Sequence, residues 1–330
     1  MKKKKLVVTK TPLRISFFGG GTDIDYFYKK KFGEVFSTTI DKYIYVTVKE
    51  HSNIFAQKYR LNYSVSERKN DIKSIKNNII RETLKYLKID RPLYISSIGD
   101  LPNKSGLGSS SSFIVGLIKA LFELEGKIIT KKKLAEMACY IEIKVLKNPI
   151  GKQDQYAAAY GGVNHYSFLK NSEVKITSKK IYVNFIKKIF KNSMLLYTGI
   201  TRNSSEILGA QKKEKHTFEN LLKIKKICNE FINTKKNQIN LNTFIKYLER
   251  SWQIKKDITK KMTNPRIDKI YKLLEIYGAR GIKLLGAGGG GFFFFIVEKK
   301  KRNDLVKNLS NYKILDLNYE SQGSRVILKK

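Results

Sequence analysis

Runs of apolar residues predict strands in both halves of the chain. Residues 6–9 and 35–48 are rich in β-branched and aromatic side chains, and residues 93–98 repeat this composition. Between residues 279 and 300, two strand-like runs flank a turn rich in glycine, and residues 304–330 predict a short helix followed by two more strands. These strands do not alternate regularly with helices, which argues against a parallel doubly wound sheet.

Other stretches carry apolar residues at helical spacing. They recur every three or four positions over residues 72–88, and again in the segment that follows a run of four serines. A helix is expected over residues 131–147, where Thr130 is well placed to cap its start. Residues 204–260 are helical in pattern and rich in lysine.

The chain is long enough for two domains of ordinary size. It has 330 residues, of which 42% are hydrophobic and 12% aromatic, so we expect a substantial core and little disorder. Because strands and helices are mixed, we predict an α+β protein with one domain over residues 1–185 and a second over residues 186–330.

Targeting and cross-linking signals are sparse. The basic residues at the start precede only Leu6, Val7 and Val8, which is too short for a signal peptide. No run of about 18 apolar residues predicts a membrane span, so we expect a cytoplasmic protein without a membrane partner. The two cysteines, Cys139 and Cys228, form no CxxC pair; we expect buried thiols rather than a zinc site or a disulfide framework.

The strongest global signal is a formal net charge of +38, with 66 lysines and arginines. A protein that binds nucleic acid gathers its charge on one face or in one segment. Here lysine is spread along the whole chain and no nucleic-acid motif accompanies it, so no specific nucleic-acid partner is expected. The positive field favours small anionic ligands such as phosphorylated compounds.

The most informative segment reads LPNKSGLGSSSS, over residues 101–112. It is either a flexible serine-rich linker or a loop that holds an anion. A linker would have polar residues on both sides, whereas this segment lies between a predicted strand and an apolar helix. Glycines allow backbone N–H groups to approach an anion, and the start of a helix favours negative charge. We therefore interpret residues 101–112 as a phosphate-binding loop.

Two other segments are rich in glycine. Residues 286–291 formally match GxGxxG, but four phenylalanines follow instead of a helix, so a dinucleotide site is rejected. Both a tight hairpin and a close approach to another loop or a ligand remain open there. The segment 11–27 contains Arg14 at the end of a strand-like turn, then three glycines, then Asp23. Asp23 either caps a turn or, together with Arg14, suits a sugar phosphate.

Taken together, the three segments resemble those of the GHMP kinase superfamily, whose second motif has the form P-x-x-x-G-L-G-S-S-A-A. This chain matches it from Pro102 onward, with Ser111 and Ser112 at the two alanine positions. The sequence GGGTD at residues 19–23 is similar to the branch that acts on heptose 7-phosphate and, less closely, to fucokinases. The stretch LLYTGITRNSSEIL at residues 195–208 is also similar to the heptose 7-phosphate branch. The resemblance implies the GHMP kinase fold, with an N-terminal domain like ribosomal protein S5 and a ferredoxin-like C-terminal domain.

The resemblance also implies which residues bind ATP and Mg²⁺. Glu142 lies twelve residues before the Asp154–Gln155 pair, which is the spacing of the Mg²⁺-binding glutamate in the family; Glu136 has the wrong spacing. Ser110 would be the second ligand, with Ser109 as the alternative hydroxyl. A solvated Glu142 and an Asp154 in an ordinary turn are the competing interpretation. The ATP phosphates would contact the loop residues Pro102, Lys104, Ser105, Gly106, Leu107, Gly108, Ser109, Ser110 and Ser111.

The remaining implied residues act on the sugar. Asp154 would accept or orient the proton of the attacking hydroxyl, and Arg14 would stabilise charge near the transferred group. Arg202 is the first candidate, and Lys152 the second, to bind a phosphate that the sugar already carries. The complete implied set of sugar-binding residues is Arg14, Gly20, Gly21, Thr22, Asp23, Lys152, Asp154, Arg202, Gly288 and Gly289.

By resemblance, the predicted reaction is transfer of a phosphoryl group from ATP to the anomeric hydroxyl of D-glycero-D-manno-heptose 7-phosphate. The product would be heptose 1,7-bisphosphate, a precursor of nucleotide-activated heptose for surface polysaccharide. The alternatives are another sugar kinase of the superfamily, such as a fucokinase-like enzyme or a sugar 1-kinase, and a catalytically silent sugar and ATP sensor on the same fold. A homodimer is also left open.

Overall fold

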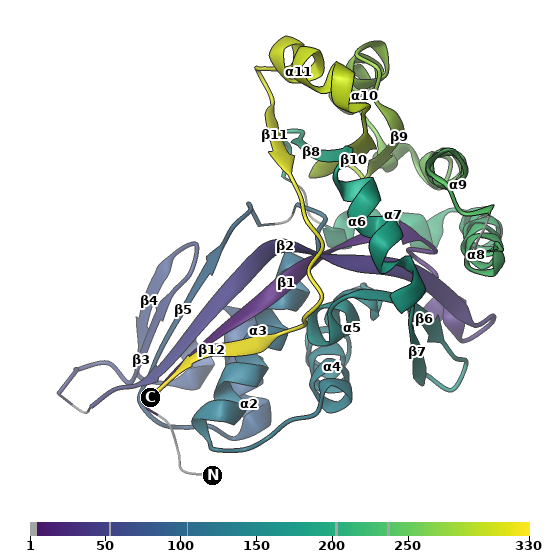
Figure 1. Cartoon of the computed structure of the whole chain (residues 1–330). Helices are drawn as coiled ribbons and strands as arrows, with labels where there is room; N and C mark the ends of the chain where they lie inside the picture. Colours follow the sequence, from purple (N-terminus) through teal and green to yellow (C-terminus); the bar gives the residue numbers. More distant parts are fainter. Residues whose placement is uncertain (1–4, 53, 104, 202–203, 236–237) are drawn as a thin grey trace.

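A computed structural model describes the chain apart from residues 1–4, 53, 104, 202–203 and 236–237, and its elements form two β-sheets with helices packed on each (Figure 1). Within the described residues the larger sheet has eight strands in the order β12-β1-β2-β5-β3-β4, with β6 paired to β2 and β7 paired to β6. These strands are β1 (Leu6–Phe18), β2 (Gly33–Glu50), β3 (Tyr59–Asn62), β4 (Ser66–Lys69), β5 (Leu93–Gly99), β6 (Val163–Phe168), β7 (Val174–Ser178) and β12 (Arg325–Lys329).

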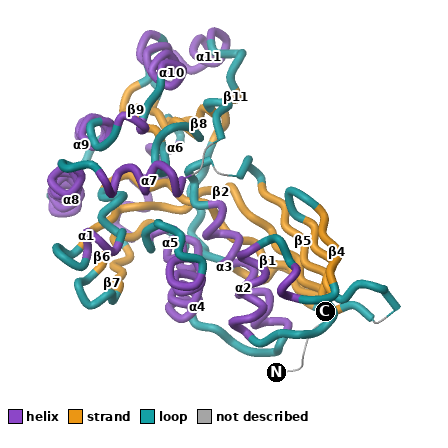
Figure 2. The backbone as a smooth tube through the Cα atoms, turned by 180° about the vertical axis from the view of Figure 1, so that it is seen from behind, coloured by secondary structure: helices purple, strands orange, loops and turns teal. Residues whose placement is uncertain are grey.

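Helices of the first half of the chain cover one face of the larger sheet, as the view from behind shows (Figure 2). The helix α3 packs directly on β1 and β2, and α4 and α5 pack beside it. A short helix, α1, connects β1 to β2. These helices are α1 (Asp25–Tyr28), α2 (Asn78–Leu87), α3 (Ser109–Leu124), α4 (Lys131–Cys139) and α5 (Gln153–Tyr160).

The smaller sheet has four strands within the described residues, in the order β11-β8-β10-β9, all antiparallel. Its strands are β8 (Ser193–Tyr197), β9 (Arg280–Leu284), β10 (Phe292–Ile296) and β11 (Lys313–Asp316). The helices of this half are α6 (Val183–Phe190), α7 (Ser204–Lys213), α8 (Thr217–Asn233), α9 (Leu241–Lys256), α10 (Pro265–Ile276) and α11 (Lys299–Asn308). The predicted α+β class is confirmed by this mixture of largely antiparallel sheets and helices.

The chain returns to the larger sheet at its end. Strand β12 pairs with β1, so that Val7 lies opposite Lys329. The last strand therefore belongs structurally with the first half of the chain, although it lies within the range predicted for the second domain. The division at residue 185 remains a prediction.

Two predicted helices are divided in the structure. The range 72–88 contains a single 3₁₀ turn (Ile72–Ser74) and then α2, because the side-chain oxygen of Asn77 accepts a hydrogen bond from the Ile80 amide (3.0 Å) and begins a new helix. In the range 131–147, Thr130 caps α4 as predicted, but α4 gives way to a wider π-helical turn over Tyr140–Val145.

Strand β1 is longer than predicted. It continues from residue 6 to Phe18 because residues 11–18 also pair with β2. The prediction that Arg14 ends a turn is wrong: Arg14 lies inside this strand, opposite Thr39 of β2. A strand holds a side chain more rigidly than a turn does, because hydrogen bonds to the neighbouring strand fix its backbone.

One aromatic cluster joins the two halves of the molecule. The cluster contains Phe17 and Phe18 at the end of β1, Phe231 of α8 and Phe244 of α9. The ring centres of Phe17 and Phe244 are 5.1 Å apart. Those of Phe18 and Phe231 are 4.7 Å apart. Aromatic pairs at such distances add to the stability gained by burial. The end of β1 is thereby fixed between the two sheets.

Two further features of the sequence have structural counterparts. Cys139 and Cys228 are both buried and free, as expected for apolar helical surroundings. None of the helices in the described part of the chain is both long enough and apolar enough to cross a membrane.

Candidate active site

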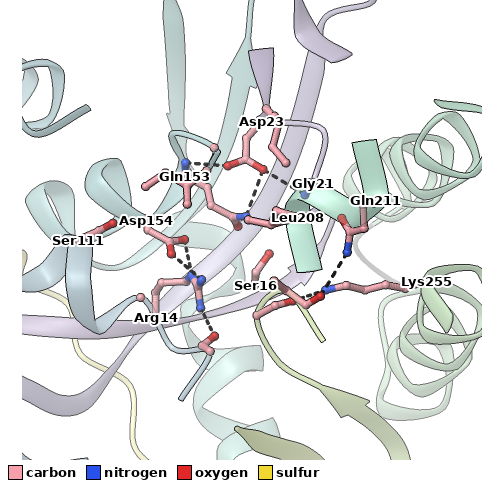
Figure 3. Close-up of a pocket in the computed structure, with 18 of the residues that line it drawn as sticks. Arg14, Ser16, Gly21, Asp23, Ser111, Gln153, Asp154, Leu208, Gln211 and Lys255 are labelled. Atoms are coloured by element: carbon pink, nitrogen blue, oxygen red, sulfur yellow. Dashed lines mark hydrogen bonds and ion pairs between the residues drawn. The ribbon is translucent and has the colours of Figure 1, made fainter. Parts of the chain in front are cut away.

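A cavity of about 270 Å³ opens between the two halves of the chain. It is lined by β1 and the glycines that follow it, by the serine loop and the start of α3, and by residues of α9 and β9 from the second half. Figure 3 shows side chains from these elements pointing toward one another. Side chains from both halves of the chain thus meet in this cavity.

The serine loop forms one wall of the cavity. Gly106 and Gly108 have φ values of +84° and +81°, a left-handed conformation that side chains other than glycine rarely adopt, and Gly108 directly precedes α3. Gly106, Gly108, Ser109, Ser110 and Ser111 line the cavity. The first amides of α3 have no partner within the helix, so the loop is suited to an anion such as a phosphate. The linker interpretation of this segment is wrong.

Glu142 lies behind the serines and is fully buried. Its carboxylate accepts hydrogen bonds from the hydroxyls of Ser110 (2.9 Å) and Ser111 (2.8 Å) and from Nε2 of Gln155 (2.6 Å). Burial raises the pKa of Glu142, whereas these three donors lower it. The interpretation of Glu142 as a solvated helix residue is therefore wrong.

Arg14 and Asp154 face each other at the centre of the cavity. Nε and Nη2 of Arg14 donate to the two carboxylate oxygens of Asp154, each at 2.7 Å, and Nη1 donates to the carbonyl of Gly106 at 2.8 Å. A two-point contact of this kind fixes the plane of the carboxylate. Because Arg14 projects from a strand, Asp154 is held beside the serine loop with one defined orientation (Figure 3).

Asp23 forms a second acidic position in the cavity and is buried. Its carboxylate accepts hydrogen bonds from the amides of Gly21 (3.0 Å) and Gln153 (3.0 Å) and from Nε2 of Gln153 (3.2 Å). Burial raises the pKa of Asp23, and the nearby charge of Asp154 raises it further. Gly151 leaves room for this carboxylate, since a Cβ there would lie 1.9 Å from Oδ2 of Asp23.

The third glycine segment is a hairpin that approaches the serine loop. Strands β9 and β10 are antiparallel neighbours, so the loop between them is a hairpin. A strand follows the glycines where a dinucleotide-binding motif would be followed by a helix, which agrees with the rejection of such a site. A Cβ on Gly291 would lie 2.3 Å from the backbone oxygen of Ser105, so only glycine permits this approach. The segment is therefore both a tight hairpin and a place where the backbone comes close to another loop, as the two interpretations of its sequence predicted.

Comparison with known proteins decides the family. A model of the GHMP kinase N-terminal domain matches residues 74–162, and a model of the GHMP kinase C-terminal region matches residues 225–313. The chain belongs to the GHMP kinase family. The predicted family resemblance is confirmed, and ATP is the phosphoryl donor that GHMP kinases use.

Individual relatives agree with this assignment. A D-glycero-alpha-D-manno-heptose 7-phosphate kinase from Campylobacter jejuni is 32% identical over 97% of this chain and 98% of its own length. A mevalonate kinase from Methanocaldococcus jannaschii is 25% identical over 92% and 96% of the two chains. The crystal structure of a D-glycero-D-manno-heptose 1-phosphate kinase from Bacteroides thetaiotaomicron has the same fold, with a TM-score of 0.77, 24% identity and coverage of 98% and 99%.

Several residues predicted for the site of this kinase lie away from the cavity. Nζ of Lys152 donates to the carbonyl of Ser172 (2.7 Å) and lies over the ring of Tyr28. The hydroxyl of Thr22 is buried and donates to backbone carbonyls of Gly19 and Glu34. Pro102, Ser105, Leu107, Gly288 and Gly289 also fall outside the cavity lining.

The physical reasons differ between these residues. Lys152 immediately precedes α5, and its side chain reaches the loop before β7 rather than the cavity. Gly288 and Gly289 pack against Met262, whose carbonyl accepts a hydrogen bond from the Gly289 amide (2.7 Å). Lys104 and Arg202 lie outside the described residues.

Seven polar residues that line the cavity were not predicted from the sequence. These are Ser16, Asn148, Gln153, Gln211, Ser251, Lys255 and Lys283. Gln211 donates to the carbonyl of Ala287 (3.2 Å), and Lys255 donates to the carbonyl of Gly286. With 66 basic residues along the chain, no lysine can be selected without the fold.

Proposed function

We propose that this GHMP kinase transfers the γ-phosphoryl group of ATP to the anomeric hydroxyl of D-glycero-D-manno-heptose 7-phosphate. The observation that carries the proposal is the Arg14–Asp154 pair, which lies between a phosphate-binding loop and the buried Asp23. The relative from Campylobacter jejuni, matched over nearly its whole length, supports the choice of sugar.

In this mechanism Asp154 orients the anomeric hydroxyl and accepts its proton. The hydroxyl oxygen forms a bond to the γ-phosphorus while the bond from that phosphorus to the β,γ-bridging oxygen breaks, so that ADP leaves with the electron pair. Arg14 fixes the Asp154 carboxylate through two hydrogen bonds and adds positive charge near the transferred group. Asp23, with Gly20 and Gly21 beside it in the cavity wall, binds hydroxyls of the sugar.

The residues around Glu142 fit the Mg²⁺ that kinases of this family usually employ. A hydroxyl and a carboxylate are hard oxygen donors, and Mg²⁺ is commonly held by one or two carboxylates together with substrate phosphates. Ser110 and Glu142 would hold the ion, and their 2.9 Å contact brings both donors to the wall that also carries the serine loop. The bound ion would neutralise charge on the phosphates.

The steric role of Gly151 leads to a prediction. Gly151→Ala is expected to displace the Asp23 carboxylate, because the new methyl group would overlap Oδ2. The KM for the sugar phosphate should rise by about tenfold, with little change in the KM for ATP, since a displaced carboxylate loses its hydrogen bonds to the sugar. Gly209→Ala is the matched control, because a Cβ at Gly209 meets no atom within 4 Å. An unchanged sugar KM in Gly151→Ala would contradict the role of Asp23.

A panel of acceptors tests the choice of substrate. It would include D-glycero-D-manno-heptose 7-phosphate, the same heptose without phosphate, fucose, galactose and mevalonate, with ADP release as the measurement. We expect the highest kcat/KM for heptose 7-phosphate. A higher kcat/KM for any other member of the panel would contradict the proposal, and ATP binding without turnover on any acceptor would indicate a silent sensor instead.

The product, heptose 1,7-bisphosphate, would serve the synthesis of nucleotide-activated heptose for surface polysaccharide. That role and a cytoplasmic location are parts of this proposal.

A further inference from the structure

Two lysines from the second half of the chain line the cavity. Lys255 is in the last turn of α9, and Lys283 lies within β9. In Figure 3, Lys255 and Gln211 lie on the side of the cavity opposite Ser111 and Asp154. Lys255 therefore lies across the cavity from Asp154, and the part of the lining formed by Lys255 and Lys283 is called the basic side.

Lys283 is unusual because it is a buried lysine. The residue is 4% exposed, and its side-chain nitrogen donates a hydrogen bond to the carbonyl of Phe17. Within the part of the chain that the structure describes, no carboxylate forms an ion pair with it. Burial lowers the pKa of Lys283 well below its ordinary value, and the nearby charges of Lys255 and Arg14 lower it further. An ammonium group has three donors, so Lys283 can bind an anion as well as Phe17.

Neutral hydroxyl groups extend the basic side. Ser251 is one turn before Lys255 on α9, so both residues are on the same face of the helix and both line the cavity. The hydroxyl of Ser16 is buried, lines the cavity and has no hydrogen-bond partner among the described residues. A buried hydroxyl without a partner costs free energy that a bound ligand can recover.

We propose that Lys255 and Lys283, with Ser16, bind the phosphate group that the acceptor sugar already carries. This inference rests on the proposed function, since only a phosphorylated acceptor needs such a subsite. The sugar would span the cavity, with its anomeric hydroxyl at Asp154, its other hydroxyls at Asp23 and its phosphate at the two lysines. A phosphate there relieves the repulsion among Lys283, Lys255 and Arg14.

Arg202, the first candidate for this phosphate, lies outside the described residues. The proposed subsite replaces the second candidate, Lys152. That side chain is engaged with Ser172 and Tyr28, away from the cavity.

A phosphate of ATP is the other anion that could approach the two lysines. The amides at the start of α3 are suited to the ATP phosphates, and they lie across the cavity from Lys255, which favours the acceptor phosphate for the lysines.

Steady-state kinetics with Lys255→Met and Lys283→Met test the subsite. Methionine keeps the length of the apolar stem and removes the charge. Each variant is expected to raise the KM for heptose 7-phosphate by about tenfold or more, because a charge-assisted hydrogen bond is lost, while the KM for ATP changes little. The preference for heptose 7-phosphate over unphosphorylated heptose, measured as the ratio of their kcat/KM values, should fall by a similar factor.

Three controls make the result decisive. Lys256→Met removes a charge from the same helix; Lys256 lies outside the cavity lining and over the ring of Tyr271, so its kinetics should match the wild type. Thermal unfolding monitors the fold, and if Lys283→Met does not fold, the more accessible Lys255→Met decides alone. Calorimetric titration with heptose 7-phosphate measures binding without turnover.

The outcomes separate this inference from the proposed function. Wild-type enzyme that does not use heptose 7-phosphate contradicts the proposed function before any variant is made. Wild-type enzyme that prefers heptose 7-phosphate, together with lysine variants whose sugar KM and affinity are unchanged, overturns the subsite alone. A rise in the KM for ATP in place of the sugar KM would assign the lysines to the nucleotide and also overturn it.

Discussion

Asp154→Asn is expected to lower kcat by about a thousandfold, because asparagine cannot accept the proton of the attacking hydroxyl. The substitution keeps the shape of the side chain and retains an oxygen that can accept a hydrogen bond from Arg14, whose contacts with Asp154 are both 2.7 Å long. ATP affinity should therefore stay close to the wild-type value. Single-turnover kinetics and equilibrium binding of a non-hydrolysable ATP analogue measure the two quantities separately.

Asp268→Asn is the matched control for this substitution. Asp268 is an exposed residue in the first turn of α10, and it lies outside the cavity lining. Its replacement should leave both kcat and ATP affinity unchanged. Near-normal turnover in Asp154→Asn would remove Asp154 from proton transfer and reduce its role to binding.

Glu142→Gln should raise the Mg²⁺ concentration needed for half-maximal activity by about tenfold or more, because the ion loses a charged ligand. Glutamine has nearly the same volume, so the pocket formed by Ser110, Ser111 and Gln155 remains filled. Initial rates at saturating ATP over a titration of free Mg²⁺ give the measurement, and thermal unfolding shows that the variant has folded.

Glu136→Gln provides the comparison, since Glu136 lies six residues earlier on the exposed face of α4. The two carboxylates are the nearest rivals in sequence, and only Glu142 is buried beside the serines. An identical Mg²⁺ titration for Glu142→Gln and the wild type would contradict the metal assignment.

The parts of the site that lie within one loop could be predicted from the sequence. The glycines at 106 and 108 and the serines after them predict a phosphate loop, because they stand between a strand and an apolar helix. Glu142 and Asp154 were singled out by the resemblance to the family, through their spacing of twelve residues. In the structure both residues reach the cavity that the serine loop lines, and Gln155 connects to Glu142 through a hydrogen bond of 2.6 Å.

The functions of the last two serines were less apparent from the sequence. Ser111 and Ser112 stand where relatives have alanine, and small size alone was a sufficient explanation. Both hydroxyls form hydrogen bonds in the structure: Ser111 donates to Glu142, and Ser112 donates to the carbonyl of Pro12 (2.9 Å). Ser111 thus adds a donor to the buried carboxylate, and Ser112 ties α3 to β1.

The basic side of the cavity could not be predicted, because it is assembled by contacts between distant segments. Lys283 lines the cavity from β9, and ring contacts of Phe17 with Phe244 and Phe294 hold the end of β1 against the second half of the chain. Conversely, Lys152 is adjacent in sequence to Gln153 and Asp154, which line the cavity, but its own side chain contacts the carbonyl of Ser172 instead. Closeness in sequence therefore predicts which residues share a site only when one rigid element holds them.

The position of the new phosphate on the product tests the central claim most directly. Two-dimensional correlation of ³¹P with ¹H on the product formed from heptose 7-phosphate and ATP identifies the carbon that carries each phosphate. The mechanism at Asp154 predicts two phosphorus signals, one correlated with the anomeric proton and one with the protons at C7. A new phosphorus correlated with any other proton would contradict phosphorylation at the anomeric hydroxyl.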